Sequence, residues 1–382
     1  MNTHALFSSL AVLAASTLIA GCTCRDDVTY TAFQPPAPLE SDHGQWLSMG
    51  VAPDGSLVTS YYDRDQRALG FAIGEIRDGG QVWWTHEQVD GYPDDQGLNP
   101  GDVGLHTSMK VADNGDVWVA YYAQQNGALK VAHRQGGEWT TELADAGGGL
   151  NPDTGRWASL DLDADGNPVV AHHDESSGTL RVSRRDADGN WSSAVAFEGE
   201  DGIDSEGNTI EAKVGTYARL LIHDGTEYIA FHDEVRGSLE LLEGFPGAYT
   251  HTTVETGGVG QWPSLWTDGT TLLIAFHDVA NQDLALARRD GASWSVETVD
   301  TDDYVGADTE VFRDTDGIGI VYFDGQFNDM RIARESGDGW STQSIGGNEQ
   351  AVGYHNEIAY TEGRWFVASY DYTNRTIFAQ PL

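Results

Sequence analysis

Short runs of alternating apolar and polar residues recur through most of the chain. Two examples are TLRVSRR from Thr179 and WSVETV from Trp294. An alternation with a period of two is typical of β-strands, whereas no sustained helical period follows the N-terminal segment. Asp-Gly and Asn-Gly turns such as APDGS and ADNGD separate the runs and supply the positive φ angles that tight hairpins need. The pattern predicts an all-β chain.

The predicted strands fall into seven repeated units. Each unit opens with a glycine, and the clearest copies continue with any residue, an aromatic residue, any residue and serine, as in GQWLSM and GRWASL. A turn follows, then an apolar strand that ends in an aromatic or His residue plus Asp, then a third strand and a Trp-led fourth strand. The opening glycines, 45 to 60 residues apart, are Gly44, Gly104, Gly155, Gly215, Gly260, Gly306 and Gly353. Four short strands at this period predict a seven-bladed β-propeller.

The last unit ends one strand short, at RTIFAQPL. Residues 28–33, VTYTAF, precede the first unit and share the apolar spacing of a fourth strand. We therefore expect this N-terminal strand to complete the last blade and to close the ring, which would remove strand edges that favour aggregation. Residues 28–382 are predicted to form a single propeller domain.

The N-terminal 21 residues have the apolar stretch of a secretory signal peptide. Their end, LIAGC at residues 18–22, resembles the lipobox of bacterial lipoproteins. The resemblance implies that Cys22 is acylated and that residues 22–27 form a lipid-anchored tether. Because Thr23 follows Cys22 instead of Asp, we expect an exported protein of the outer rather than the inner membrane. A signal peptide cleaved elsewhere is the alternative.

The units also resemble a known group of propellers. VAYYAQQNGALKVAH and VVAHHDESSGTLRVSRR are similar to the Tyr-Tyr-Asp repeats of secreted bacterial proteins in the broad sialidase-like propeller group. The resemblance covers nearly all of residues 44–382 and implies the fold. The chain has RQGGEW and RDGASW where sialidases place the Asp box, and it shows no obvious arginine triad. Sialidase catalysis is therefore not expected.

The charge of the chain limits its partners. With 60 acidic and 21 basic residues, the formal net charge is −39. Such a field repels nucleic acid and anionic surfaces, and it attracts cations and basic ligands. Apart from Cys22 the chain has one cysteine, Cys24, so no internal disulfide is expected. We expect a monomer.

Three second strands end in a His-Asp pair, in VVAHHD, YIAFHD and LIAFHD. The Asp recurs in six of the seven units, which indicates a structural role in the following turn. The fourth-strand tryptophans recur in the same way and are expected to pack between blades. Asp161, Asp163, Asp165 and Gly166 match half of an EF-hand loop, but His172 stands at the twelfth position, so we expect a hairpin turn.

Positions at which the repeat is broken are candidates for a site. The first-strand aromatic residue becomes Asp308 in the sixth unit and His355 in the seventh, and the serine becomes Glu310 and Glu357. On neighbouring strands at one channel mouth, these four residues are metal-ligand candidates, for Ca²⁺ through oxygen or for Zn²⁺ through histidine. Long acidic connections at residues 90–102, 145–155, 198–212 and 300–304 are further Ca²⁺ candidates. Hydrogen bonds between blades are the alternative role.

The leading functional hypothesis is a cell-envelope binding module for a glycan, a peptide or a protein, with Ca²⁺ as an optional aid. Its candidate ligand contacts at the channel mouth are Trp46, His106, Trp157, Tyr217, Trp262 and Arg219. The second hypothesis is a polysaccharide lyase or glycosidase, by analogy of fold. Its candidate catalytic residues are His173, His232, His277, Tyr122 and Arg219. A scaffold without a small ligand is the third.

Overall fold

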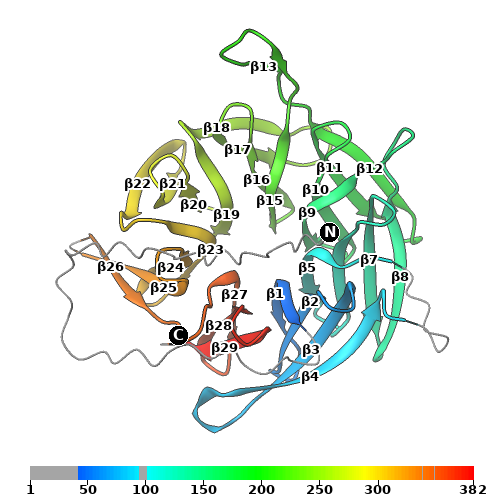
Figure 1. Ribbon diagram of the computed structural model, residues 1–382, viewed down its shortest axis with the longest axis vertical. Helices are drawn as coiled ribbons and strands as arrows, with labels where there is room; N and C mark the ends of the chain where they lie inside the picture. The colour runs from blue at the N-terminus through cyan, green and yellow to red at the C-terminus, as the bar shows by residue number, and fades with distance from the viewer. Residues whose placement is uncertain (1–41, 94–100, 338, 348) are drawn as a thin grey trace, which may run out of the picture. The chain divides into compact units, whose positions relative to one another are not determined.

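The structure is a computed structural model that describes residues 42–93, 101–337, 339–347 and 349–382. In these residues seven antiparallel sheets surround a central channel as a seven-bladed β-propeller (Figure 1). The predicted fold is therefore confirmed. Strands follow one another across each sheet in chain order, four in six of the blades and three in the seventh. No helix among the described residues has the length and apolar character needed to cross a membrane.

The strands of the first three blades have the following bounds. Blade 1 has β1 (His43–Val51), β2 (Leu57–Asp63), β3 (Ala68–Ile76) and β4 (Val82–Asp90), with the 3₁₀ turn η1 (Asp78–Gly80) before β4. Blade 2 has β5 (Leu105–Val111), β6 (Val117–Ala123), β7 (Ala128–Gln135) and β8 (Glu138–Asp145). Blade 3 has β9 (Thr154–Leu162), β10 (Pro168–Asp174), β11 (Thr179–Arg185) and β12 (Trp191–Phe197).

A two-stranded hairpin of β13 (Gly202–Ile203) and β14 (Thr209–Ile210) projects from the connection to blade 4 (Figure 1). Blade 4 has β15 (Val214–His223), β16 (Thr226–Asp233), β17 (Ser238–Gly244) and β18 (Thr250–Thr256). Blade 5 has β19 (Val259–Thr267), β20 (Thr271–Asp278), β21 (Asp283–Asp290) and β22 (Ser293–Asp300). Blade 6 has β23 (Val305–Asp314), β24 (Gly317–Asp324), β25 (Asp329–Ser336) and β26 (Gly339–Ser344). Blade 7 has β27 (Tyr354–Thr361), β28 (Arg364–Asp371) and β29 (Thr376–Pro381).

The hydrophobic core lies between the blades instead of at the centre of the ring. Seven clusters of buried side chains each draw on two neighbouring sheets. The second strands contribute most to them, and every residue of β2, β6 and β10 is buried. A strand covered on both faces reads as a continuous apolar run, which explains why these strands lack strict alternation.

Blade 7 packs against blade 1 and closes the ring. Leu47 and Tyr61 of blade 1 share a buried cluster with Phe366 of β28 and Ile377 of β29. The backbone N–H of His43 also donates to the carbonyl of Arg375 at 3.1 Å. The strand predicted at residues 28–33, the signal peptide and Cys22 lie outside the described residues, so those predictions stay open.

First strands line the channel, and their antiparallel pairing with the second strands determines which groups share a face. Gln45 near the start of β1 pairs with Tyr62 near the end of β2. The same register places Gln261 of β19 opposite His277 of β20. The starts of the first strands and the His-Asp ends of the second strands therefore share one face, as predicted. We call it the mouth face.

Candidate functional site

A β-bulge near the start of each first strand aims one side chain at the channel mouth. In blade 1, Gln45 pairs with Tyr62 and Ser48 pairs with Ser60, so two residues of β1 lie opposite the single residue Tyr61. The first residue of the bulge has a φ of 47° to 55° in all seven blades. These residues, which we call the mouth ring, are Trp46, His106, Trp157, Tyr217, Trp262, Asp308 and His355. Positive φ is costly for bulky residues, so its sevenfold repetition shows that the whole fold imposes it.

The mouth ring is nearly continuous and surrounds a small cavity. Trp46 lies 4.0 Å from His106 and 4.7 Å from His355 between ring centroids. Trp157 lies 4.6 Å from His106 and 4.1 Å from Tyr217, and Tyr217 lies 4.7 Å from Trp262. The cavity that these side chains line has a volume of about 120 Å³. Each ring residue is half-buried, so the aromatic faces are only partly covered by their neighbours.

Polar groups in the cavity wall are desolvated. Burial lowers the pKa of His106 to about 3, and burial lowers the pKa of His355 despite the opposing effect of Asp308. Burial raises the pKa of Asp308, whose Oδ1 lies 3.8 Å from Nδ1 of His355. Nδ1 of His106 and Oδ1 of Asn356 are buried and have no hydrogen-bond partner among the described residues. Neutral histidines and the carboxyl group of Asp308 are therefore the titratable groups beside the aromatic rings of the mouth ring.

An ion cluster of one arginine and two glutamates lies below the mouth ring. Arg219 of β15 donates to Glu310 of β23 and, at 3.3 Å, to Glu357 of β27. Burial raises the pKa of both glutamates, and Arg219 opposes this shift. All three side chains line both the mouth cavity and a second cavity of about 410 Å³ deeper in the channel. Arg219 is thus the partner of two acids, and its side chain, 32% exposed, also lines the mouth cavity.

This arrangement gives the predicted metal site no support. Glu310 and Glu357 face Arg219, whereas Asp308 and His355 face each other in the mouth ring. Across the residues that the structure describes, no three His, Cys, Asp or Glu side chains are grouped so as to hold a metal ion. The sequence correctly placed the four residues on neighbouring strands, but a cation of the protein itself occupies the position between the two glutamates.

In four blades a serine stands at the first-strand position that the ion cluster occupies in the other three, and it connects neighbouring blades. Oγ of Ser48 accepts the backbone N–H of Met109 at 3.0 Å, and Oγ of Ser108 accepts that of Leu160 at 2.9 Å. The same bond recurs from Leu220 to Ser159 at 2.8 Å and from Val311 to Ser264 at 3.0 Å. The repeated serine is therefore structural, and the charged residues Arg219, Glu310 and Glu357 take its position in blades 4, 6 and 7.

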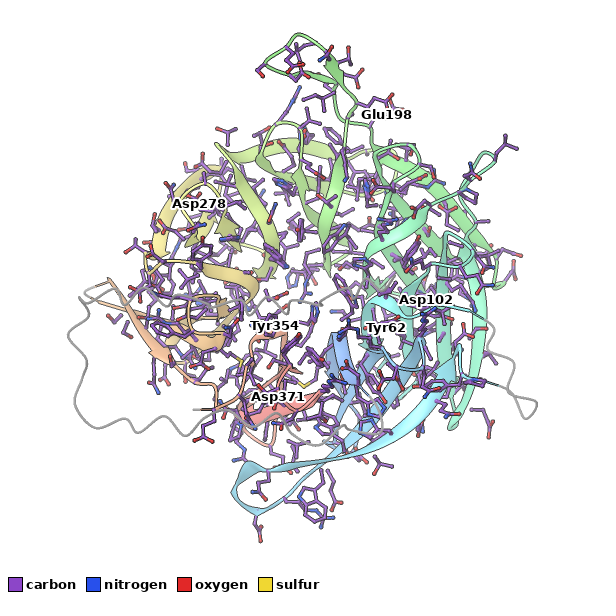
Figure 2. The ribbon with its side chains drawn as sticks, viewed as in Figure 1. Tyr62, Asp102, Glu198, Asp278, Tyr354 and Asp371 are labelled. Atoms are coloured by element: carbon purple, nitrogen blue, oxygen red, sulfur yellow. The ribbon has the colours of Figure 1, made fainter. Side chains whose placement is uncertain are left out.

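Residues before the strand-end Asp also join one blade to the next. The hydroxyl of Tyr62 donates to Asp102 at 2.9 Å (Figure 2). The same bond joins Tyr122 to Asp153 at 2.7 Å and Tyr370 to Asp42 at 2.6 Å. In each case the Asp stands two residues before the glycine that opens the next blade. We call these contacts the blade latches.

Histidine takes the place of tyrosine where that Asp is missing. Lys213 and Gly258 occupy the Asp position before blades 4 and 5. There Nδ1 of His173 donates to the carbonyl of Val214 at 2.8 Å, and Nδ1 of His232 donates to that of Val259 at 2.9 Å. His277, the next in the series, has no hydrogen-bond partner for either ring nitrogen among the described residues. The sequence shows this pairing, because tyrosine occurs where the next blade is preceded by that Asp and histidine where it is preceded by Lys213 or Gly258.

The candidate catalytic residues of the enzyme hypothesis are distributed over blades 2 to 5. Tyr122 forms a blade latch, His173 and His232 each bond a backbone carbonyl of the following blade, and the two histidines are buried. Burial lowers the pKa of His277 to about 4, in blade 5, while Arg219 lies in the ion cluster. An acid–base mechanism needs two groups within reach of one substrate. Tyr122, His173 and His232 already use polar atoms in hydrogen bonds between blades.

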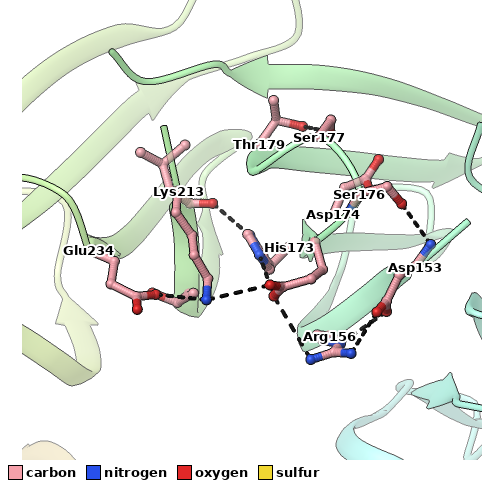
Figure 3. A network of polar contacts seen from close by, with 12 residues as sticks. Asp153, Arg156, His173, Asp174, Ser176, Ser177, Thr179, Lys213 and Glu234 are labelled. Atoms are coloured by element: carbon pink, nitrogen blue, oxygen red, sulfur yellow. Dashed lines mark hydrogen bonds and ion pairs between the residues drawn. The ribbon is translucent and has the colours of Figure 1, made fainter. Parts of the chain in front are cut away.

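An alternating chain of charges surrounds part of the mouth (Figure 3). Arg156 contacts Asp153 at 2.6 Å and Glu175 at 3.8 Å. Lys213 contacts Glu175 at 3.5 Å and Glu234 at 3.0 Å. Nε2 of His173 lies 3.2 Å from the same Glu175. Each cation of this charge chain is therefore shared between two carboxylates.

The repeated Asp and Trp residues have the predicted structural roles. The strand-end Asp233 accepts the backbone N–H groups of Val235 and Arg236, both at 3.0 Å. Trp139 of β8 and Trp191 of β12 donate from Nε1 to glutamates of the preceding blade, Glu87 at 3.0 Å and Glu142 at 2.7 Å. Asp163 accepts the N–H groups of Asp165 and Asn167 in a turn between β9 and β10, as the hairpin prediction requires.

No protein-family model matches the sequence, and a search of curated proteins gives no match. Among solved structures, the six-bladed fucose-recognising lectin of Aleuria aurantia is 15% identical and covers 80% of this chain and 96% of its own, with a TM-score of 0.48. A leech intramolecular trans-sialidase is 11% identical, and the match covers 90% of this chain and 68% of the trans-sialidase chain, with a TM-score of 0.45. A protein of unknown function from Dyadobacter fermentans is 14% identical, and the match covers 86% of this chain and 90% of that protein's chain, with a TM-score of 0.46. Similarity at this level says nothing of ligand or activity.

Proposed function

We propose that this protein is a binding module of the bacterial cell envelope and that its mouth ring takes a glycan. The observation that carries the proposal is the sevenfold bulge, which directs the half-buried rings of Trp46, Trp157, Tyr217 and Trp262 at one cavity. Aromatic faces stack on the C–H faces of sugars while polar groups beside them select hydroxyls. A cavity of about 120 Å³ suits a terminal group of a glycan better than a long chain.

Binding without catalysis agrees best with the contacts at the mouth. The mouth ring itself contains one carboxylate, Asp308, and its histidines are neutral. The histidines proposed for catalysis hold backbone carbonyls or lie buried without a partner. A peptide or protein partner would use the same face, and a glycan is favoured because the cavity is small and aromatic.

The test is titration with neutral oligosaccharides, followed by intrinsic Trp fluorescence and calorimetry. A bound sugar should change the emission of the mouth tryptophans. Trp157→Ala and Trp262→Ala should each weaken binding at least about fivefold, since stacking on one aromatic ring contributes about 1 kcal/mol or more. Trp191→Phe changes a tryptophan between blades and should leave affinity unchanged. A glycan array on which the protein binds no sugar would contradict the proposal.

We also propose that the chain is a lipoprotein held in the outer membrane through Cys22. The proposal rests on the sequence LIAGC alone, because these residues lie outside the described part of the structure. Labelling with a radioactive fatty acid should mark the wild-type chain and leave Cys22→Ser unmarked. Recovery of the label in the inner-membrane fraction would contradict the expected location.

A further inference from the structure

We infer that the glycan bound at the mouth carries a protonated amine, as an amino sugar does, and that acidic sugars are excluded. The inference rests on the proposed function and names the class of its ligand. Three independent features of the mouth favour a cation over an anion or a neutral group: the aromatic rings, the hydrogen-bond acceptors Oδ1 of Asn356 and the Asp308 carboxylate, and the excess of carboxylates.

The aromatic faces come first. Ammonium groups are attracted to the faces of aromatic rings within about 6 Å of the centroid, most strongly to Trp. Trp46, Trp157, Tyr217 and Trp262 all line the same small cavity. Adjacent Trp157 and Tyr217 lie only 4.1 Å apart, so a group held by one ring is also near the next. Several π faces around one cavity resemble an aromatic cage for a cation.

The unsatisfied groups are the second feature. Nδ2 of Asn356 donates to the carbonyl of Asp308 at 3.0 Å, which leaves Oδ1 of Asn356 as an acceptor. That oxygen is buried and unpartnered among the described residues, and Asn356 is 5% exposed. The carboxylate of Asp308 lines the same cavity and also accepts hydrogen bonds. An ammonium group has three donors and no acceptor, so it matches this pair of acceptors better than a hydroxyl does.

The local charge balance is the third feature. Arg219 lies below the ring and contacts two carboxylates, Glu310 and Glu357. Arg156 and Lys213 in the charge chain each contact two carboxylates as well. An acidic sugar would have to draw one of these cations away from its acids. The formal net charge of −39 adds long-range repulsion for an anion and attraction for a cation.

Asp308 can be tested without disturbing the backbone. Its φ of 47° is left-handed, a conformation that Asn adopts at least as readily as Asp. Asp308→Asn therefore removes the charge and keeps the shape. Asp188→Asn, in the exposed turn between β11 and β12, removes the same charge from the chain at a position outside the mouth cavity. The two variants separate a local effect from the effect of net charge.

The probes are chitohexaose and its fully deacetylated counterpart, titrated by calorimetry at a pH at which the amines are protonated. We expect the deacetylated hexamer to bind at least about tenfold more tightly, which is the effect of one ion pair at a desolvated site. Asp308→Asn should reduce this preference about tenfold, and Asp188→Asn should leave it within about twofold.

The outcomes are distinguishable. Equal affinity for both hexamers, or tight binding of a sialylated or uronate oligosaccharide, would overturn the inference and leave the proposed glycan function intact. Equal losses in Asp308→Asn and Asp188→Asn would overturn it too, because the preference would then reflect net charge alone. Binding of neither hexamer, together with a glycan array without hits, would overturn the proposed function itself.

Discussion

The hydroxyl of Tyr122 in blade 2 donates a 2.7 Å hydrogen bond to the carboxylate of Asp153, which precedes the first strand of blade 3. Tyr370 and Asp42 make the equivalent contact, at 2.6 Å, where the last blade meets the first. These latches join residues of different blades, so they stabilise the ring as a whole. They also explain why the aromatic residue before the strand-end Asp recurs.

Removal of single latches should have unequal effects. Asp153 keeps two hydrogen bonds from Arg156 when Tyr122 is changed, so Tyr122→Phe should lower the free energy of unfolding by about 1 kcal/mol. Asp42 is buried, so Tyr370→Phe should cost about 2 to 3 kcal/mol. Urea denaturation measures both. Equal losses would show that burial of the acceptor does not control the strength of a latch.

The two histidines His232 and His277 should respond in opposite ways to the same substitution. Phe323 occupies the equivalent position in blade 6, so Phe is compatible with the site. His277→Phe removes two buried nitrogens without partners and should raise the free energy of unfolding by about 1 kcal/mol. His232→Phe leaves the carbonyl of Val259 without its donor and should lower it by about 1 to 2 kcal/mol. Thermal melting in parallel provides the comparison.

Stability should fall as the pH is lowered from about 7 to about 5. Burial lowers the pKa of His106 to about 3 and that of His277 to about 4 in the folded protein. In the unfolded chain a histidine has a pKa of about 6.5, so below that pH the unfolded state binds protons that the folded state does not. Each such group lowers the free energy of unfolding by at most about 1.4 kcal/mol per pH unit. His277→Phe should therefore flatten the pH dependence, and an unchanged slope would contradict this assignment.

The ion cluster can be replaced by the residue that the other blades use. Arg219→Ser alone leaves Glu310 and Glu357 buried without their cation and should cost about 3 kcal/mol. The triple variant Arg219→Ser, Glu310→Ser and Glu357→Ser restores the repeat serine in all three blades. This variant should regain most of the free energy of unfolding that Arg219→Ser loses, because each serine can accept a backbone N–H from the next blade. Urea denaturation measures the difference. A triple variant as unstable as the single one would show that the cluster contributes more than charge balance.

The repeat made much of the fold predictable from sequence. The alternation of apolar and polar residues and the Asp-Gly turns are signals that span only a few residues. Because the pattern occurs seven times, the less regular copies can be recognised by comparison with the clear ones. The same comparison of copies identified the mouth residues, including Asp308 and His355, because the substituted positions stand out against a constant background. The reading of Asp308, Glu310, His355 and Glu357 as a metal site finds no support in the side-chain positions of the described residues. It assumed that the charged residues on adjacent strands face one ion, whereas Glu310 and Glu357 face Arg219 from across the channel.

The sequence by itself determined the number of blades, the order of the strands within a blade and the ring of mouth positions, because these depend on local periodicity and on repetition. Only the tertiary structure decided the partners of the side chains. Arg219, Glu310 and Glu357 come from blades 4, 6 and 7, and no local pattern places a guanidinium between two glutamates 91 and 138 residues away. The left-handed bulge that turns Trp157 and Asp308 into the same cavity likewise depends on pairing with the second strand and on closure of the ring. Contacts across a closed ring join residues whose separation along the chain carries no information about their distance in space.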